Sequence, residues 1–342
     1  MKMISPIPSV IARGCRGALL LCLASHLTYG QGTPGRLVWP APPDDPRIAY
    51  VGSISCPQDA GFRPAMLRRF SNWLSGAQVG NQPMSHPFGV AVDGAGNFCF
   101  TDTGLNNVTY CDRAGKKWYT WGEVGGTRFQ APVAVAADGK VIYVADSSLA
   151  TVIQFDLAGK IMGRIAAGLQ RPCGLAISGG RLYVVDSAAQ CVDIFDLKGK
   201  SLGRFGQRGD GPGFFNYPTH IAADGPGNLY VTDSMNNRVQ IFDPAGNYIR
   251  EIGQAGDSPG CFSRPKGVAV DPAGRIYVVD AMFGNFQIFD AGGQLLLAVG
   301  ETGSDPGEFS LPAGIAISGG NQIYVADTFN GRLQEFKYIA AP

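Results

Sequence analysis

A pattern that repeats six times between Pro87 and Tyr338 constrains the fold more than any other feature of the chain. Each copy opens with proline and a short apolar run, then passes through a glycine-rich turn to an apolar run that ends in aspartate. A third run ends in an aromatic residue. A period in the forties with several short strands per unit is typical of a β-propeller blade. We therefore predict an all-β, six-bladed β-propeller with four-stranded antiparallel blades.

Two sets of residues mark the copies. The opening prolines stand 45, 40, 46, 47 and 47 residues apart: Pro87, Pro132, Pro172, Pro218, Pro265 and Pro312. The second runs end at Asp102, Asp146, Asp186, Asp233, Asp280 and Asp327. A residue found in every blade usually serves the blade, so we expect each aspartate to cap its own turn through backbone amides. A ring of carboxylate ligands on one face is the alternative.

Composition supports this fold and narrows the function. The 342 residues include 48 Gly and 23 Pro, which many tight turns require, and 45% are hydrophobic, as in an ordinary globular core. The formal net charge is +1. Because no basic surplus exists, we expect no nucleic-acid partner.

The first 30 residues have the features of an export signal. Three basic residues, Lys2, Arg13 and Arg16, precede a short apolar core at 17–24 and a small-residue cleavage site. The core is too short to span a bilayer, and no other segment is apolar and long enough. We expect a soluble periplasmic or secreted monomer with no membrane span. A disordered cytoplasmic leader is the alternative.

The segment before the repeats divides into three parts. Residues 31–46 are rich in proline and predict an extended lead-in, and the propeller itself is expected over residues 47–342. Apolar residues at helical spacing predict a short helix over 64–75. Since the sixth copy stops after its third strand, residues 47–54 are expected to supply its outer strand and close the ring. Residues 48–52 match the pattern of residues 249–253 in the fourth copy.

Several motifs give the chain a family resemblance. The linkers GQRGDGPGFFNYP (206–218), GQAGDSPGCFSRP (253–265) and GETGSDPGEFSLP (300–312) resemble those of NHL-repeat propellers, as do NLYVTDSMNNRVQIFD (228–243) and NQIYVADTFNGRLQEF (321–336). The resemblance covers residues 87–338, and the lead-in resembles exported bacterial six-bladed members. Only RIAAGLQRP (164–172) joins the second and third copies. The resemblance implies a fold shared by protein- and RNA-binding modules, with metal-dependent lyases and hydrolases among its relatives.

No catalytic constellation stands out in the repeats. A relative of the amidoglycolate-lyase type would be expected to hold zinc through three histidines on different blades, but only His86 and His220 follow the signal, at different repeat positions. No nucleophile elbow, phosphate loop or calcium loop is present. We therefore predict no catalytic residue, no metal and no cofactor.

Two candidate ligand-binding residues lie at the start of the innermost strands. The equivalents of His220 are the small residues Gly89, Ala134, Gly174, Gly267 and Gly314. Small residues let inner strands converge, so His220 is expected to enter the channel mouth as a ligand or proton-transfer group. Bonding to a neighbouring turn is the alternative. Lys266, equivalent to Thr219, would add a charge nearby.

Six cysteines follow the signal, an even number that favours disulfides in an exported chain. Five copies carry Tyr on the second strand and an aromatic on the third, twelve residues later; the first copy has Cys99 and Cys111 there instead. We expect these two to face each other and form a bridge. Cys173 and Cys191, at the same end of one blade, form a second candidate pair. Cys56 and Cys261 remain by elimination.

The linkers also carry aromatic residues: Phe129, Phe214, Phe215, Phe262 and Phe309. One per linker is expected to stabilise a blade junction, and Phe215 is expected to be the extra, exposed ring. Together these features predict an exported, non-enzymatic binding or scaffold propeller that presents one loop face to a protein or another cell-envelope ligand. The alternative is a metal-dependent lyase or hydrolase with a site at the central channel.

Overall fold

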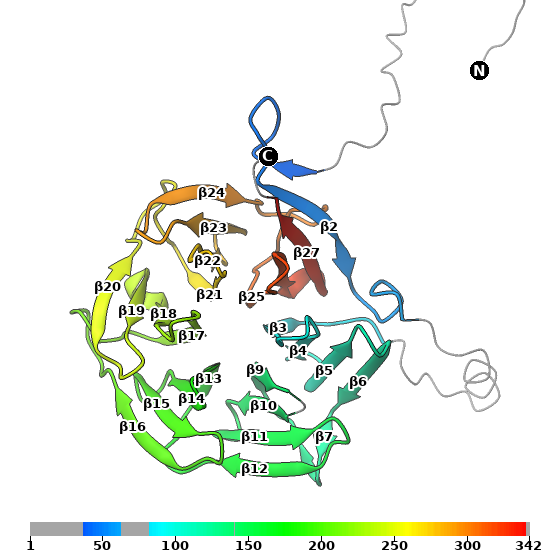
Figure 1. The fold of residues 1–342 in the computed structure, drawn as a ribbon, viewed down its shortest axis with the longest axis vertical. Coiled ribbons are helices and arrows are strands. Elements are labelled where there is room, and N and C mark those ends of the chain that lie inside the picture. The colour runs from blue at the N-terminus through cyan, green and yellow to red at the C-terminus, as the bar shows by residue number, and fades with distance from the viewer. Residues whose placement is uncertain (1–36, 63–81, 140, 340–342) are drawn as a thin grey trace, which may run out of the picture. The chain divides into compact units, whose positions relative to one another are not determined.

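A computed structural model of the chain describes residues 37–62, 82–139 and 141–339. Within these ranges it is a six-bladed β-propeller whose blades form a ring around a central axis (Figure 1). Every blade runs antiparallel from an innermost strand, here called strand a, through strands b and c to an outer strand d. The fold predicted from the repeat is confirmed. The proposed signal and the predicted helix lie outside the described residues.

The strands of the six blades follow the repeats. Blade one holds β3 (Pro87–Val92), β4 (Phe98–Asp102), β5 (Asn107–Asp112) and β6 (Lys117–Trp121); blade two holds β9 (Pro132–Asp138), β10 (Val141–Asp146), β11 (Thr151–Asp156) and β12 (Ile161–Ile165). Blade three holds β13 (Pro172–Ser178), β14 (Arg181–Asp186), β15 (Cys191–Asp196) and β16 (Ser201–Phe205); blade four holds β17 (Pro218–Ala223), β18 (Leu229–Asp233), β19 (Arg238–Phe242) and β20 (Tyr248–Ile252). Blade five holds β21 (Pro265–Val270), β22 (Ile276–Asp280), β23 (Asn285–Phe289) and β24 (Leu295–Val299); blade six holds β25 (Ile315–Ile317), β26 (Gln322–Asp327) and β27 (Arg332–Tyr338). The short hairpin β7 (Glu123–Val124) and β8 (Thr127–Arg128) joins blades one and two, and the 3-10 turns η1 (Ser234–Asn236) and η2 (Thr328–Asn330) follow strand b of blades four and six.

The N-terminal strand β2 (Ile48–Ile54) completes blade six by pairing antiparallel with β27, and β1 (Val38–Trp39) adds a fifth strand outside it. Figure 1 shows the blue β2 beside the red β27. The strand is the predicted one, but its register differs by three residues. Tyr50 and Ile54 take the positions of Tyr248 and Ile252 in blade four, and Val51 bulges outward as Ile249 does, so residues 48–52 are not the equivalents of 249–253.

The core is divided among the blade junctions. Six clusters of buried apolar side chains are found, and each lies between two neighbouring blades. The sixth junction joins the chain's two ends, since Phe98 of blade one stacks on Tyr324 of blade six. The Arg113 side chain reaches across the same junction to Glu335, with Nη2 3.1 Å from Oε1. Blade faces are therefore apolar on both sides, unlike a sheet with one solvated face.

The linker phenylalanines lie in these junctions. Phe129, Phe215, Phe262 and Phe309 are all buried, so one ring per linker stabilises a junction as expected. The prediction for the extra ring is wrong: Phe214 is 39% exposed and Phe215 is 0% exposed. The glycine that opens this linker, Gly206, has φ 86°, and a Cβ there would lie 2.3 Å from the Phe215 ring. Glycine is required at this position for both reasons.

Candidate functional site

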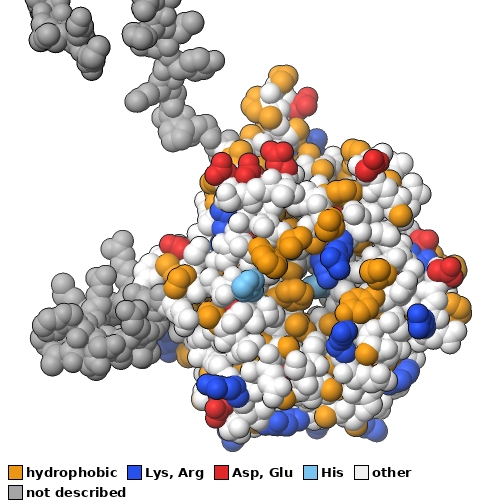
Figure 2. All heavy atoms as spheres, turned by 180° about the vertical axis from the view of Figure 1, so that it is seen from behind, with side chains coloured by type: hydrophobic (Ala, Val, Ile, Leu, Met, Phe, Trp, Pro, Cys, Tyr) orange, Lys and Arg blue, Asp and Glu red, His pale blue; other side chains and the backbone are white. Residues whose placement is uncertain are grey.

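One side of the disc carries the irregular segments and is the candidate site. The b–c turns, the linkers from strand d to strand a, and the first residues of strand a all meet there; we call this side the loop face. Figure 2 shows a face on which hydrophobic side chains and a few basic ones lie near the centre, while acidic side chains and further basic ones lie toward the rim. Loops on a rigid scaffold are where propellers commonly bind ligands.

The six repeated aspartates lie beneath the loop face and stabilise its loops. All are buried, and each accepts a hydrogen bond from at least one backbone amide of the preceding linker. In blades one, two, three and five each also accepts two amide bonds from its own b–c turn, as predicted. In blades four and six an asparagine side chain of the turn, Asn236 or Asn330, takes this place. The carboxylates are therefore structural caps and do not form a ligand ring.

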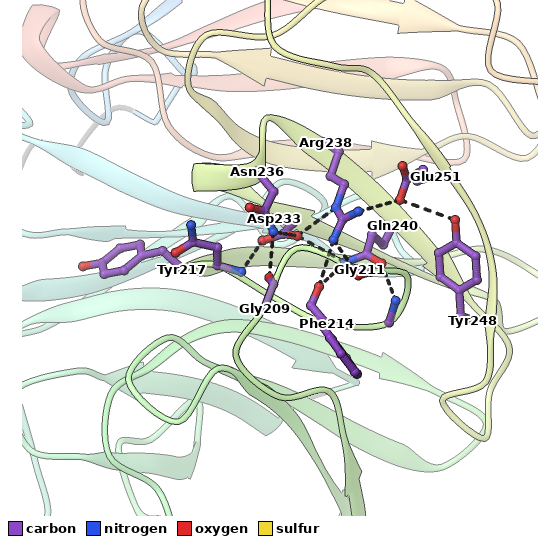
Figure 3. Close-up of polar contacts among 12 residues, drawn as sticks. Gly209, Gly211, Phe214, Tyr217, Asp233, Asn236, Arg238, Gln240, Tyr248 and Glu251 are labelled. Carbon is purple, nitrogen blue, oxygen red and sulfur yellow. Dashed lines mark hydrogen bonds and ion pairs between the residues drawn. The ribbon is translucent and has the colours of Figure 1, made fainter.

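Blade four adds a buried charge network to this cap (Figure 3). The guanidinium of Arg238 lies between Asp233, 2.9 Å from Nε, and Glu251, 2.8 Å from Nη1. Its Nη2 donates to the linker carbonyls of Gly211 and Phe214. Burial raises the pKa of Asp233, and the bonds from the linker amide, Asn236 and Arg238 oppose that rise. This network fixes the linker that ends at Tyr217 because one arginine binds both the blade and the linker.

Blade six repeats the network and blade five lacks its arginine. Arg332 lies 2.7 Å from Asp327 and donates to linker carbonyls in the same way. In blade five the equivalent residue is Asn285, whose buried Oδ1 has no hydrogen-bond partner among the described residues. There Gln287 binds the linker through the Gly260 amide and the Cys261 carbonyl, beside the amide bonds to Asp280.

The tips of the b–c turns differ sharply between the two halves of the ring. In blades four, five and six the exposed tip residue is large and apolar: Met235 (58% exposed), Met282 (54%) and Phe329 (61%). In blades one, two and three the equivalent exposed residue is small: Gly104, Ser148 and Ala188. Large exposed apolar side chains that cluster on one face mark an interaction surface.

The residues just before the strand-a prolines extend this apolar surface. Tyr217 in blade four and Leu311 in blade six are exposed, and both have left-handed backbones, with φ 60° and φ 46°. A bulky residue at positive φ is strained, and such strain persists where surrounding contacts enforce it. Gln190 accepts from the Tyr217 amide at 2.6 Å, and the Arg171 guanidinium lies over the Tyr217 ring, 5.5 Å from its centroid. We call Tyr217, Met235, Met282, Leu311 and Phe329 the apolar arc.

His220 lies at the channel mouth, as predicted. Its ring stacks against Phe88 of blade one, with centroids 5.9 Å apart and planes 28° from parallel. Blades one and four are opposite each other in the ring, so the pair crosses the axis and closes the channel. Neither ring nitrogen has a hydrogen-bond partner among the described residues. Burial, with a smaller effect of Lys266, lowers the pKa of His220 from 6.5 to about 3, so the imidazole is neutral at pH 7.

The innermost strands pack closely at the positions equivalent to His220, where the other blades have small residues. A Cβ on Gly89 would lie 2.6 Å from the Val133 carbonyl oxygen, and one on Gly314 would lie 2.4 Å from that of Phe88. The channel cavity at His220 has a volume of about 40 Å³ and is lined by backbone and small apolar side chains. That space suits a few water molecules, whereas ligand pockets are about 300–1,000 Å³.

Lys266 lies beside His220 and is half-buried. Burial lowers its pKa, and the neighbouring Arg264 guanidinium lowers it further. Among the described residues, neither Lys266, Arg264 nor Arg171 forms an ion pair. The structure thus brings both predicted candidates together with unneutralised positive charge at the mouth. In the described ranges, no three His, Cys, Asp or Glu side chains are grouped as metal ligands are.

The predicted bridge between Cys99 and Cys111 is not formed. Both thiols are free and buried, and they lie on opposite faces of blade one. The register pairs Cys99 with Tyr110 and Phe98 with Cys111, so the two cysteines are one position out of alignment. Side chains alternate between the faces of a sheet, and facing cysteines would need to be direct partners. The Tyr and aromatic pairs of the other blades are offset in the same way, as Tyr143 pairs with Gln154.

The other cysteine pairs are also free in the structure. Cys173 and Cys191 do lie at the same end of blade three, as expected, but β14 separates their strands. Two strand spacings are roughly 10 Å, beyond the Cα separation of about 7 Å that a disulfide allows. Cys56 follows β2, whereas Cys261 lies in the linker between blades four and five.

Comparison with known proteins supports the fold and leaves the activity open. A family model described as a 6-bladed beta-propeller matches residues 223–282 and 269–338, which correspond to blades four to six. No curated protein sequence matches the chain. Among solved structures, a structural genomics protein of unknown function from Bacteroides thetaiotaomicron VPI-5482 is 18% identical, with a TM-score of 0.60 over 74% of this chain and 70% of that one.

Two further similar structures have named activities. A catalytically inactive virginiamycin B lyase from Staphylococcus aureus, solved with quinupristin, is 13% identical, with a TM-score of 0.54 over 75% of this chain and 96% of that one. Hydrazine synthase of Kuenenia stuttgartiensis is 17% identical, with a TM-score of 0.55 over 78% of this chain and 99% of that one. These proteins share a fold with this chain, and folds of this kind host unrelated functions.

The apolar arc was missed in the sequence, although a signal for it is present. Aligning the six b–c turns puts Met235, Met282 and Phe329 in the column that holds Gly, Ser and Ala in the first three copies. This position differs between the blades, whereas the residues that define the repeat are shared by all of them. A search for shared residues therefore does not find it.

Proposed function

We propose that this chain is an exported NHL-type propeller that binds a partner protein through the loop face of blades four to six and has no catalytic role. The observation that carries the proposal is the apolar arc, where three exposed turn tips are large and apolar while the three equivalent tips are small. Aromatic and methionine side chains are enriched where proteins bind one another.

The rigidity beneath the arc supports a binding role. The Asp233–Arg238–Glu251 network and its counterpart at Asp327–Arg332 hold the linkers that carry Tyr217 and Leu311. A preorganised surface loses little conformational entropy on association, so more of the contact energy appears as affinity. The channel cavity, with a volume of about 40 Å³, is much smaller than the pockets that bind substrates.

Site-specific photocrosslinking in the native organism tests the proposal. A photoreactive phenylalanine analogue placed at Met235, Met282 or Phe329 is expected to crosslink one and the same partner protein, which mass spectrometry then identifies. The matched controls are the similarly exposed apolar residues Met162, Leu202 and Leu296 on the outer strands. The identified partner, purified, should bind the wild type and lose binding to a variant with alanine at all three tips. Equal crosslinking from tips and outer strands, or none from the tips, contradicts the proposal.

Export is a separate part of the proposal. The basic start and apolar core of residues 1–30 support it, and the described residues contain no helix long and apolar enough to cross a membrane. Cell fractionation with N-terminal sequencing of the mature protein tests it. A mature chain that begins near residue 31 in the periplasm or medium is expected; an unprocessed cytoplasmic chain would overturn it.

A further inference from the structure

We propose that the loop face recognises an acidic segment of its partner, with one carboxylate seated at the channel mouth beside Lys266 and Arg264 and apolar neighbours packed on the arc. This inference rests on the proposed function and names the chemistry of the partner. It comes from the charges at the mouth, the floor below them and the shape of the surface.

The charges at the mouth are all positive, and none of them forms an ion pair among the described residues. Arg171 and Arg264 occupy the same repeat position in blades three and five, just before the strand-a proline, and Lys266 follows that proline in blade five. The buried aspartates nearest to them are occupied, since Asp186 and Asp280 each accept several backbone amide bonds. A bound carboxylate would relieve the repulsion between Arg264 and Lys266 and compensate the partial burial of the lysine.

The floor of the mouth limits how deep a ligand can reach. Phe88 and His220 stack across the axis and block the channel, so an entering group stops beside Lys266. Because His220 is neutral, the floor adds no competing charge and presents a flat aromatic surface. A site of this depth accommodates a side-chain carboxylate or a chain terminus.

The surface around the mouth fits a polypeptide better than a membrane. The apolar tips Met235 and Met282 project from the turns of blades four and five, whereas Lys266 is half-buried at the start of strand a. A planar lipid surface that contacts the tips cannot also reach a recessed ammonium group, but a peptide side chain can.

Selection from a phage-displayed library of random dodecapeptides tests the inference on the full-length protein. Binders are selected on the wild type after counter-selection on the variant with alanine at Met235, Met282 and Phe329, so that only loop-face peptides survive. We expect enrichment of Asp and Glu beside aromatic or aliphatic residues. Selected peptides are then synthesised and their Kd values measured on two double variants, Arg264→Leu with Lys266→Met, and Lys198→Met with Lys200→Met.

The second double variant is the control, because it removes the same charge from the exposed c–d turn of blade three on the opposite side. Affinity is expected to fall about tenfold or more for the first variant and to stay unchanged for the second, with a stronger effect at low salt. Melting curves of both variants establish that they fold.

The outcomes separate the two proposals. Loop-face peptides without acidic enrichment, or equal affinity for both double variants, overturn the carboxylate site and leave a protein-binding face intact. Failure to enrich any loop-face peptide counts against the proposed function itself. A third outcome is that no peptide is enriched and the wild type binds vesicles containing phosphatidylglycerol, whereas the alanine tip variant does not. That result would show that the loop face binds a membrane and not a peptide.

Discussion

The two halves of the ring have the same fold but differ in how their loops are built. Blades four to six receive long glycine-rich linkers, have large apolar turn tips and, in blades four and six, hold their linkers with a buried arginine. Blades one to three have small tips, and Asn107, Thr151 and Cys191 stand where the arginine would be. The comparison shows that all six blades can share one kind of core while the loops of one half of the ring are specialised.

The largest expected effect concerns the junction that joins the halves. Deleting residues 39–54 removes β2 and exposes the edge of β27, together with the apolar contacts of Ile48 and Ile54. The loss should be comparable to the whole stability of a typical domain, about 5–15 kcal/mol, and appear as aggregation in size-exclusion chromatography.

A matched pair of point variants sharpens that test. Ile54→Ala should cost about 2–4 kcal/mol in denaturant unfolding because Ile54 is buried at the junction, whereas Val51→Ala should be nearly neutral because Val51 lies on the outward bulge. Equal costs would show that the register of β2 is wrong, and a monomeric deletion variant with unchanged melting would show that β2 is dispensable.

The next effect tests the linker network directly. Arg238→Met leaves the buried carboxylate of Asp233 uncompensated and should cost about 3–5 kcal/mol. Asn107→Ala, at the same position in blade one, should change stability by less than about 0.5 kcal/mol. In blade five, Asn285→Arg should stabilise by up to about 1 kcal/mol, since the linker carbonyls of Ser258 and Cys261 lie at the positions that arginine binds in blades four and six. Urea unfolding measures all three, and similar losses for Arg238→Met and Asn107→Ala would remove the distinction between the halves.

An effect of similar size depends on pH and on His220. Its pKa is about 3 in the folded chain and near 6.5 when unfolded, so the unfolded state binds the proton first as pH falls. The wild type is therefore fully stabilised above pH 6.5 and loses up to about 1.4 kcal/mol per pH unit between 6.5 and 3. His220→Gly, which restores the residue of most other blades, should lack this component. Melting temperatures of both proteins from pH 7 to 4 give the difference, and parallel curves would contradict the neutral buried imidazole.

The smallest effect concerns the strained positions of the apolar arc. Leu311→Gly relieves a left-handed backbone and should change stability by no more than about 1 kcal/mol, with stabilisation the expected sign. Ala131→Gly, at the equivalent position in blade two without positive φ, should destabilise by about 0.5–1 kcal/mol. Both are measured by thermal unfolding, and destabilisation of equal size in both would show that Leu311 carries no strain.

Most of the architecture could be predicted from the repeat. The prolines, the aspartates and the missing outer strand of blade six predicted six blades and their closure, because each of these residues has a local role in a turn or at a strand start. His220 could be placed at the channel mouth for the same reason, as its repeat position is the start of strand a. The face of the sheet to which a given side chain points could not be predicted from local sequence.

The errors share that origin. Matching residues 48–52 to 249–253 put β2 three residues out of register, and the number of residues in the b–c turn put Cys99 and Cys111 on opposite faces of blade one. Phe214 and Phe215 exchanged places because neighbouring residues in an extended linker point to opposite sides. Each error is an odd-numbered offset in a side-chain pattern with a period of two, and spacing along the chain does not determine that offset.

The sequence by itself determined the number of blades, the strand that closes them and the residues repeated in every blade, since these depend on local turns and on a periodic apolar pattern. Only the tertiary structure decided what the blades present together. Phe88 and His220 meet across the axis, and Met235, Met282 and Phe329 form one arc beside Arg264 and Lys266, because closing the ring brings equivalent positions of distant repeats to the same face. The candidate site consists of different residue types at the same repeat positions, and these residues come together only when the ring is closed.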